Sequence, residues 1–283
     1  MCITFIFISD DLCSKYKLII LNNRDENLDR PTLELDWRDG VLSGIDLQDA
    51  TRGTWFGMNK SGRIGILLSI TQSAEMKKKN CPSRGAITND FLKRSSPCDE
   101  FFNELADKAR EYNGFQFLGL ERDGCESYRM YSLCSMLVDP VEPRMWPPGT
   151  YVWSNSPPEK PFRKVTEGKK LFEKFVASLD NELEVQEIIE KLLKIATDKT
   201  KHCPDPQIEQ QTGLPEEHYR NLCSIMVKFP PNVLRYGTRS HSILIVDRND
   251  NATFYEKRIA SMPQNNGEAE WVDKTVTLKL NPL

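Results

Sequence analysis

The sequence of 283 residues has no apolar run approaching the roughly 20 residues that a membrane-spanning helix needs. Its first residues lack the basic stretch of a secretory signal. It has neither the Met-Gly start of a myristoylation site nor a C-terminal CaaX box. We therefore expect a cytoplasmic protein without a transmembrane segment.

The cysteines and charges exclude further classes. Eight cysteines are scattered along the chain without a C-x-x-C pair, which argues against a zinc ribbon or a thioredoxin motif. Scattered thiols are typical of a reducing compartment. No paired histidines have metal-ligand spacing, so no structural metal is expected. A net charge of −3 with 28% charged residues gives no signature of nucleic-acid or membrane binding.

The order of predicted elements is strands, helices, strands, helices, strands, which indicates an α+β fold. It suits two stacked antiparallel sheets covered by helices, in a four-layer αββα sandwich. Without an internal repeat, a low-complexity tract or a clear linker, we predict one domain over residues 1–283. Residues 202–214 read as a polar loop. The strands are predicted at 2–8, 16–21, 37–42, 54–58, 63–70, 115–120, 128–133, 151–153, 223–229, 240–246, 252–255 and 275–280, and the helices at 84–93, 96–113, 171–179 and 181–196.

The start of the chain, Met1-Cys2, is its most informative feature. Aminopeptidases remove an initiator methionine before a small residue, and we expect Met1 to be removed. Cys2 would then carry a thiol nucleophile and a free α-amine that can act as its base. Cysteine at this position also occurs by chance, so the surroundings must decide.

Residues 2–8 and 16–21 read as a β-hairpin. If Ile8 faces Tyr16, antiparallel pairing sets Cys2 opposite Asn22 and beside Asn23-Arg24-Asp25-Glu26. A guanidinium and two carboxylates then lie next to the thiol. An exposed hairpin end rich in turn-forming residues is the alternative.

Further motifs follow in order along nearly the whole chain. They are Arg30-Pro31, Gly53-Thr54-Trp55-Phe56-Gly57, Gly149-Thr150-Tyr151 with Ser154-Asn155, and Tyr236-Gly237-Thr238-Arg239. Together with Met1-Cys2 and Asn23-Arg24-Asp25-Glu26 they resemble the NRDE family, also called the transport and Golgi organisation protein 2 family. The resemblance implies the N-terminal-nucleophile (Ntn) hydrolase fold. Family members have been linked to haem trafficking, to lipid metabolism, and to Golgi and mitochondrial integrity, and no settled reaction comes with the resemblance.

An acyl-transfer site needs a nucleophile, a base and an oxyanion hole. Cys2 is the candidate nucleophile, Arg24 can lower the thiol pKa, and Asp25 can bind the α-amine or carry a proton. The resemblance adds Asn155 as an oxyanion donor and Arg239 as an arginine near the nucleophile. The alternatives are a turn former before prolines for Asn155 and a strand-end surface charge for Arg239.

One departure from the family pattern concerns Ser69. Many family members have an Asn near the end of the strand that follows the Gly-Thr-Trp motif, whereas this stretch is Leu67-Leu68-Ser69-Ile70-Thr71. A hydroxyl then stands where an amide would serve as a second oxyanion donor. Loss of one donor typically costs about 10²–10³ in rate. The protein can therefore keep the pocket without efficient hydrolysis.

Haem is the second possibility that the residues leave open. Cys81-Pro82 and His202-Cys203-Pro204 are Cys-Pro pairs, and a thiolate or an imidazole can ligate iron. Cys2, His202 and Cys203 are the candidate ligands, and ordinary loops are the alternative for each Cys-Pro pair. Haem also needs aromatic walls and a cation, for which the candidates are Trp55, Phe56, Tyr151, Trp153 and Arg239.

Two functions therefore remain open. The first, which the resemblance favours, is an intracellular carrier that mobilises haem or another amphipathic small molecule from storage or organelle sites. The second is a Cys2-dependent amidohydrolase or acyltransferase that acts on an amide or acyl thioester in lipid metabolism. A membrane-organising adaptor is a third, which no residue singles out. Association with mitochondria or other organelles is a further implication of the resemblance.

Overall fold

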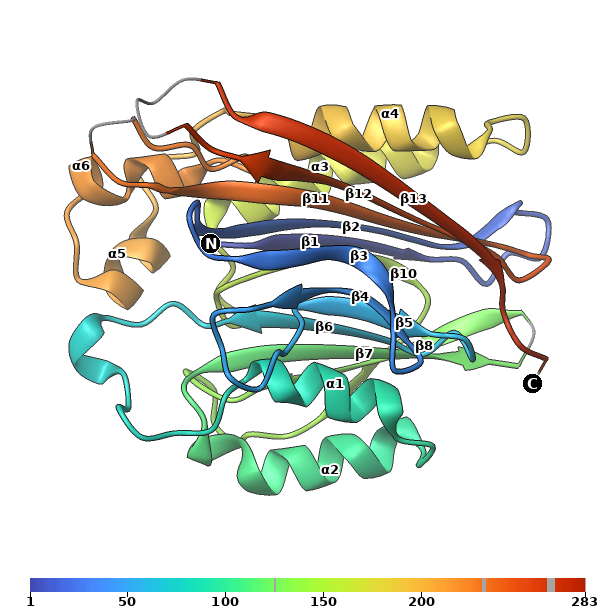
Figure 1. The fold of residues 1–283 in the computed structure, drawn as a ribbon, viewed down its shortest axis with the longest axis horizontal. Coiled ribbons are helices and arrows are strands. Elements are labelled where there is room, and N and C mark those ends of the chain that lie inside the picture. Colours follow the sequence, from blue (N-terminus) through green and yellow to red (C-terminus); the bar gives the residue numbers. More distant parts are fainter. Residues whose placement is uncertain (125, 231–232, 264–267, 283) are drawn as a thin grey trace.

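Two antiparallel sheets stacked face to face form the centre of the computed structural model, which describes residues 1–124, 126–230, 233–263 and 268–282 (Figure 1). The first sheet has the strand order β10 (Gly149–Ser154), β1 (Ile3–Ile8), β2 (Tyr16–Asn27), β11 (Tyr236–Asp247), β12 (Asn251–Ser261), β13 (Glu270–Lys279). The second has the order β3 (Thr32–Arg38), β4 (Val41–Asp46), β5 (Phe56–Asn59), β6 (Ile64–Ser69), β7 (Phe115–Asp123), β8 (Ser127–Cys134), β9 (Arg144–Trp146).

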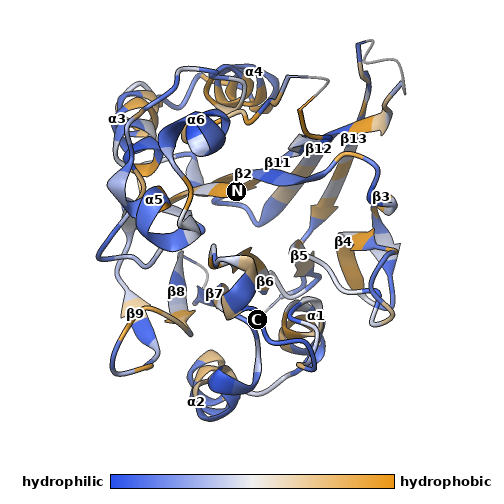
Figure 2. Cartoon of the chain, turned by 90° about the vertical axis from the view of Figure 1, so that its left-hand side faces the viewer, coloured by the Kyte–Doolittle hydropathy of each residue, from blue (hydrophilic) through white to orange (hydrophobic). Residues whose placement is uncertain are grey.

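Helices cover the outer face of each sheet. The helices are α1 (Gly85–Lys93), α2 (Cys98–Lys108), α3 (Arg163–Ala177), α4 (Val185–Ala196), α5 (Pro206–Thr212) and α6 (Glu216–Tyr219). Figure 2 shows α3 and α4 above the first sheet, α1 and α2 below the second, and the strand ends between them. None of the helices in the described ranges is long and apolar enough to cross a membrane.

Alternation along the strands divides the apolar residues into three layers. In β1, Ile3 and Phe5 pack against α3 and α4, whereas Ile6 and Ile8 pack between the two sheets. A third cluster lies between the second sheet and helices α1 and α2. The four-layer αββα sandwich predicted from the sequence is therefore confirmed.

Several predicted elements differ from the structure. Residues 37–42 are not one strand, because Asp39 and Gly40 adopt positive φ angles of 50° and 79° and turn the chain from β3 into β4. This is the Asp-Gly turn of a tight hairpin. Residues 202–214 contain helix α5, which Asp205 caps by accepting hydrogen bonds from two backbone N–H groups.

Two further predictions, at residues 181–196 and 223–229, need correction. The helix predicted at 181–196 begins later, as α4 at Val185, with Glu184 as its N-cap and Glu187 as the partner in the capping box. The predicted strand 223–229 is not a strand: its start lies in the 3₁₀ turn Arg220–Cys223, and one isolated bridge joins Lys228 to Gly237. Its apolar residues are buried at the edge of the helical layer, which explains the strand-like pattern.

Candidate functional site

Cys2 lies at the open end of the β1–β2 hairpin. Ile3 pairs with Asn23 across the two strands, and the same register sets Cys2 level with Arg24. The thiol lies against the backbone of Asp25: Sγ accepts the Asp25 N–H at 3.4 Å and is 3.7 Å from the Asp25 carbonyl oxygen. The proximity of Cys2 to Arg24 and Asp25 inferred from the hairpin is therefore observed.

The register itself was predicted with an error of two residues. Ile8 pairs with Leu18, not with Tyr16. The hairpin ladder ends where the Ser9 N–H bonds the Lys17 carbonyl at 3.0 Å, and the chain turns between these two residues. A shift of two residues keeps every side chain on its expected face of the sheet. A shift of one residue would have moved the side chains of one strand to the opposite face.

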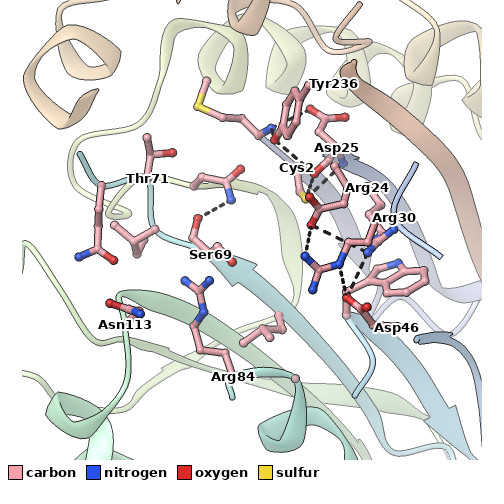
Figure 3. A pocket seen from close by; sticks show the side chains of 18 of the residues that line it. Cys2, Arg24, Asp25, Arg30, Asp46, Ser69, Thr71, Arg84, Asn113 and Tyr236 are labelled. Carbon is pink, nitrogen blue, oxygen red and sulfur yellow. Dashed lines mark hydrogen bonds and ion pairs between the residues drawn. The ribbon is translucent and has the colours of Figure 1, made fainter. Parts of the chain in front are cut away.

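A cavity of about 680 Å³ opens beside Cys2 (Figure 3). Its volume falls in the range typical of small-molecule sites. The walls come from the ends of both sheets, from the start of α1 and from the segment that follows α5. Apolar side chains share the lining with charged ones; the charged set is Arg24, Arg30, Lys77, Arg84, Asp25, Glu26, Asp46 and Asp49.

The α-amine of Met1 is held by buried polar groups at the edge of the cavity. Its nitrogen lies 2.5 Å from the Tyr236 hydroxyl and 3.3 Å from Asp25 Oδ2. The other carboxylate oxygen of Asp25 accepts a hydrogen bond from the Thr238 hydroxyl at 2.6 Å. Lys164 Nζ donates to the Met1 carbonyl at 2.9 Å and lies 3.9 Å from Asp25 Oδ2. Asp25 therefore faces two cations.

Burial dominates the protonation of these groups. Burial lowers the pKa values of the Met1 α-amine and of the Lys164 ammonium, although Asp25 raises both. Burial also raises the pKa of the Cys2 thiol, against the lowering effects of the α-amine and of Arg24. The expected lowering by Arg24 is present, but it is smaller than the effect of burial. The thiol is therefore held in its neutral form.

Arg24 joins two of the sequence motifs. Its guanidinium carbon lies 4.0 Å from the centroid of the Trp55 ring, and Nη2 is 3.5 Å from Asp46 Oδ2. Arg30 binds the same carboxylate, with Nε 2.6 Å from Oδ2. Glu26 lies 3.9 Å from Arg24 and 3.7 Å from Arg30. The arginines are thus neutralised by carboxylates, and Trp55 forms part of the cavity wall.

Asn155 lines the cavity and lies beside Ser69. Its amide nitrogen donates to the Ser69 carbonyl. Its backbone carbonyl accepts from the Thr71 N–H at 2.9 Å and from Gln211 Nε2 at 3.0 Å. One of the two N–H groups of the amide expected to serve as an oxyanion donor is therefore bound to Ser69, and only the other N–H is left for a substrate oxygen.

Comparison with known proteins identifies the family. The family model described as Transport and Golgi organisation 2 matches residues 1–261. The chain belongs to this family. The mouse Transport and Golgi organization 2 homolog is 27% identical over 98% of this chain and 99% of its own length. The Drosophila melanogaster Transport and Golgi organization protein 2 is 29% identical over 90% of each chain.

Solved structures match this chain at low sequence identity. The C2A mutant of the conjugated bile acid hydrolase from Clostridium perfringens has a TM-score of 0.49 and 10% identity, with coverage of 99% of this chain and 97% of that one. The Caenorhabditis elegans ortholog of the N-acylethanolamine-hydrolyzing acid amidase has a TM-score of 0.46 and 9% identity, with coverage of 86% and 92%.

The structure places Arg239 outside the lining of the Cys2 cavity. It lies at a β-bulge, because the pairing of β11 with β2 shifts register between Thr238 and Ser240. Its guanidinium donates to the carbonyls of Asn27, at 3.3 Å, and of Arg30. Burial lowers the Arg239 pKa to about 10. Arg239 therefore does not line the Cys2 cavity, and it lies in a small neighbouring hollow together with Arg24 and Trp55.

His202 and Cys203 also lie outside the cavity lining. The His202 N–H bonds the Cys223 carbonyl at 3.1 Å, and Cys203 Sγ is 3.8 Å from the Arg220 carbonyl oxygen. Cys203 packs against the cluster formed by α3 and α4. This segment is thus drawn to the outer side of the first sheet, away from Cys2.

Other side chains reach the cavity that the sequence did not single out for this site. Arg84 and Asp46 line it, as does His218. Cys81, which the sequence marked only as part of a Cys-Pro pair, also lines it. Lys164 gave no sequence signal, because a lysine in the first turn of a helix is ordinary. Its burial follows only from the packing of α3 on β1.

Proposed function

We propose that this protein is a carrier that binds haem in the cavity beside Cys2 and releases it unchanged. The observation that supports the proposal is the combination of groups that line this one cavity. Haem is a large apolar ring with two carboxylates and an iron that accepts thiolate or imidazole ligands. The cavity of about 680 Å³ offers the thiols of Cys2 and Cys81, the imidazole of His218, the ring of Trp55 and the cation of Arg84.

Two features of the site favour binding over turnover. Burial raises the pKa of the Cys2 thiol, and a neutral thiol is a poor nucleophile. If Cys2 ligates the haem iron, the iron has to displace the thiol proton, because the thiolate is the form that binds metals. The Asn155 amide donates one of its two N–H groups to the Ser69 carbonyl, which leaves a single N–H for an oxyanion. Both features fit a pocket that holds its ligand without attacking it. The cation assigned to Arg239 from the sequence is replaced by Arg84 in this proposal.

The test is a titration of tag-free protein with haem, followed in the Soret region. We expect saturable binding, with a Soret band that shifts in Cys2→Ser or Cys81→Ser, whichever removes the iron ligand. Cys13→Ser is the matched control, because Cys13 is exposed and lies outside the cavity lining. A linear, unsaturable response of the wild type would overturn the carrier proposal.

A Cys2-dependent hydrolase of an amide or acyl thioester is the second candidate. It is favoured by the position of Asp25, whose N–H bonds Cys2 Sγ and whose carboxylate pairs with the α-amine. Removal of Met1 would give that amine to Cys2 itself. Robust thioester turnover that vanishes in Cys2→Ser, together with a processed N-terminus by mass spectrometry and no saturable haem binding, would replace the carrier proposal with this one.

A further inference from the structure

Three arginines line the cavity, and they differ in how their charge is balanced. Arg24 and Arg30 share the carboxylates of Asp46 and Glu26. Arg84 makes no ion pair with any acidic side chain in the part of the chain that the structure describes. The Arg84 side chain instead donates a hydrogen bond to a neutral group: Nη1 lies 2.7 Å from the Gly114 carbonyl oxygen. Figure 3 shows its guanidinium directed into the cavity from below Ser69.

The backbone around Arg84 is held in place by a contact between two glycines. A Cβ atom built on Gly53 would lie 2.4 Å from the carbonyl carbon of Gly85, and one on Gly85 would lie 3.1 Å from Gly53 Cα. The loop before β5 therefore packs directly against the start of α1. Any side chain at Gly53 would push this start away. The contact fixes the point from which Arg84 extends into the cavity.

The surroundings of Arg84 leave its charge only partly compensated. Burial lowers the Arg84 pKa; Cys81 and then Glu26 raise it by smaller amounts, and the nearby charge of Arg30, which lowers it, has the smallest effect. Lys77 lines the same cavity and adds another cation. An anion bound at this place would relieve the repulsion between Arg30 and Arg84 and replace the water that each guanidinium has lost.

We propose that Arg84 binds the carboxylate of the amphipathic ligand, on the wall of the cavity that faces Cys2. The proposal rests on the proposed function, because it uses the same cavity and orients the same class of ligand. Arg84 is the N-cap residue of α1, the helix that packs on the second sheet, whereas Cys2 immediately precedes β1 of the first sheet. A ligand anchored by its carboxylate at Arg84 extends its apolar body past Trp55 and Leu67, which also line the cavity, toward the thiol. Arg84 is thus a specificity-determining residue that selects acids over neutral analogues.

The experiment compares acids with their uncharged analogues on matched variants. The probes are haem and haem dimethyl ester, and dodecanoate and dodecanol. Arg84→Gln removes the charge and keeps a donor for the Gly114 carbonyl, Arg84→Lys keeps the charge, and Arg52→Gln makes the same chemical change at an exposed neighbour outside the lining. Circular dichroism and thermal unfolding verify that each variant is folded.

We expect Arg84→Gln to weaken binding of haem and of dodecanoate by about 10-fold to 100-fold, the range for a lost hydrogen bond to a charged group. Binding of the ester and of dodecanol should not change. Arg84→Lys should recover part of the affinity, since a lysine supplies the charge without the bidentate geometry. Arg52→Gln should match the wild type.

The outcomes separate this inference from the carrier proposal. Dodecanoate binding that depends on Arg84, without saturable haem binding, would support the carboxylate subsite and overturn the haem carrier. Equal affinity of wild type and Arg84→Gln for both acids would overturn the subsite, even if haem binds. A dodecyl phosphate affinity more than ten times that of dodecanoate would overturn the assignment to a carboxylate.

Discussion

The two ends of the sandwich both bury cationic side chains, and they differ in what lies beside those cations. At the Cys2 end, Arg24 and Arg30 face a cavity of about 680 Å³. At the other end, Lys17 lies 2.5 Å and Arg122 3.4 Å from the carboxylate of Asp250. That cluster is closely packed, because a Cβ atom on the neighbouring Gly62 would lie 3.0 Å from the Arg122 side chain.

The difference shows that a buried charge does not by itself mark a binding site. Lys17 and Arg122 are as buried as Arg24, yet they serve the packing between the two sheets. A buried ion pair contributes little stability relative to apolar residues, but losing one partner is costly. At the Cys2 end the same kind of residue faces space that a ligand can fill. Accessibility, not charge, separates a structural cluster from a candidate site.

Asp250→Asn should produce the largest effect on this comparison. The substitution removes the carboxylate that pairs with Lys17 and Arg122, and asparagine tolerates the positive φ of 60° at this position. We expect a loss of about 3 kcal/mol in the free energy of unfolding. Urea denaturation of wild type and variant measures it. A loss below about 1 kcal/mol would show that this end is as well hydrated as the cavity.

His241 sharpens the comparison, because it is a buried titratable group that packs between polar and aromatic side chains. It bonds Asn23 at 2.8 Å and stacks on Trp271, and burial, with a smaller effect of Lys257, lowers its pKa to about 4. The unfolded chain binds a proton near pH 6.5 and the folded one does not. Stability is therefore complete above about pH 6.5 and is lost as the pH falls toward 4.

Between pH 7 and pH 5 this histidine should cost about 2 kcal/mol of the free energy of unfolding. The measurement is urea denaturation at the two pH values, with His241→Gln as the matched variant. The variant should lose this part of the pH dependence while keeping a polar partner for Asn23. An identical pH dependence in both proteins would contradict the assignment to His241.

Asp46→Asn should have the smallest effect on stability. Glu26 remains near both Arg24 and Arg30, and the cavity admits water, so a loss of about 1 kcal/mol or less is expected. Anionic ligands should bind several-fold tighter, because the two arginines lose a counter-charge. Paired measurements of unfolding and of dodecanoate affinity decide it. Weaker dodecanoate binding would mean that Asp46 positions the arginines for the ligand.

The elements that depend on local pattern were predictable from the sequence. The strand around Ile64–Ser69 and the helix Gly85–Lys93 follow directly from apolar periodicity. The Asp39-Gly40 turn was also readable, since Asp-Gly between alternating strands is a strong hairpin signal, but the residues were assigned to one strand. The sequence-based error at 223–229 has another origin, because burial against helices produces the same apolar run as burial in a sheet.

The site was predictable only in part, because it joins segments far apart in the chain. Cys2, Arg24 and Asp25 share one hairpin, so the expected pairing of its two strands was enough to predict that they lie close together. Asp46, Arg84 and Lys164 meet them only through tertiary packing, which no local pattern encodes. That Arg239 lies at a bulge and outside the cavity lining was not predictable either, since a one-residue bulge leaves no trace in composition.

The contact between Gly53 and Gly85 has a consequence for how this cavity can change. It is a contact between two backbone segments and involves no side chain, so the backbone position of this cavity wall does not depend on the side chains that line it. The side chain at Arg84 can be exchanged for a neutral, acidic or larger one while the start of α1 stays where it is. The wall is therefore a natural position for redesign, where a different ligand can be selected without rebuilding the fold.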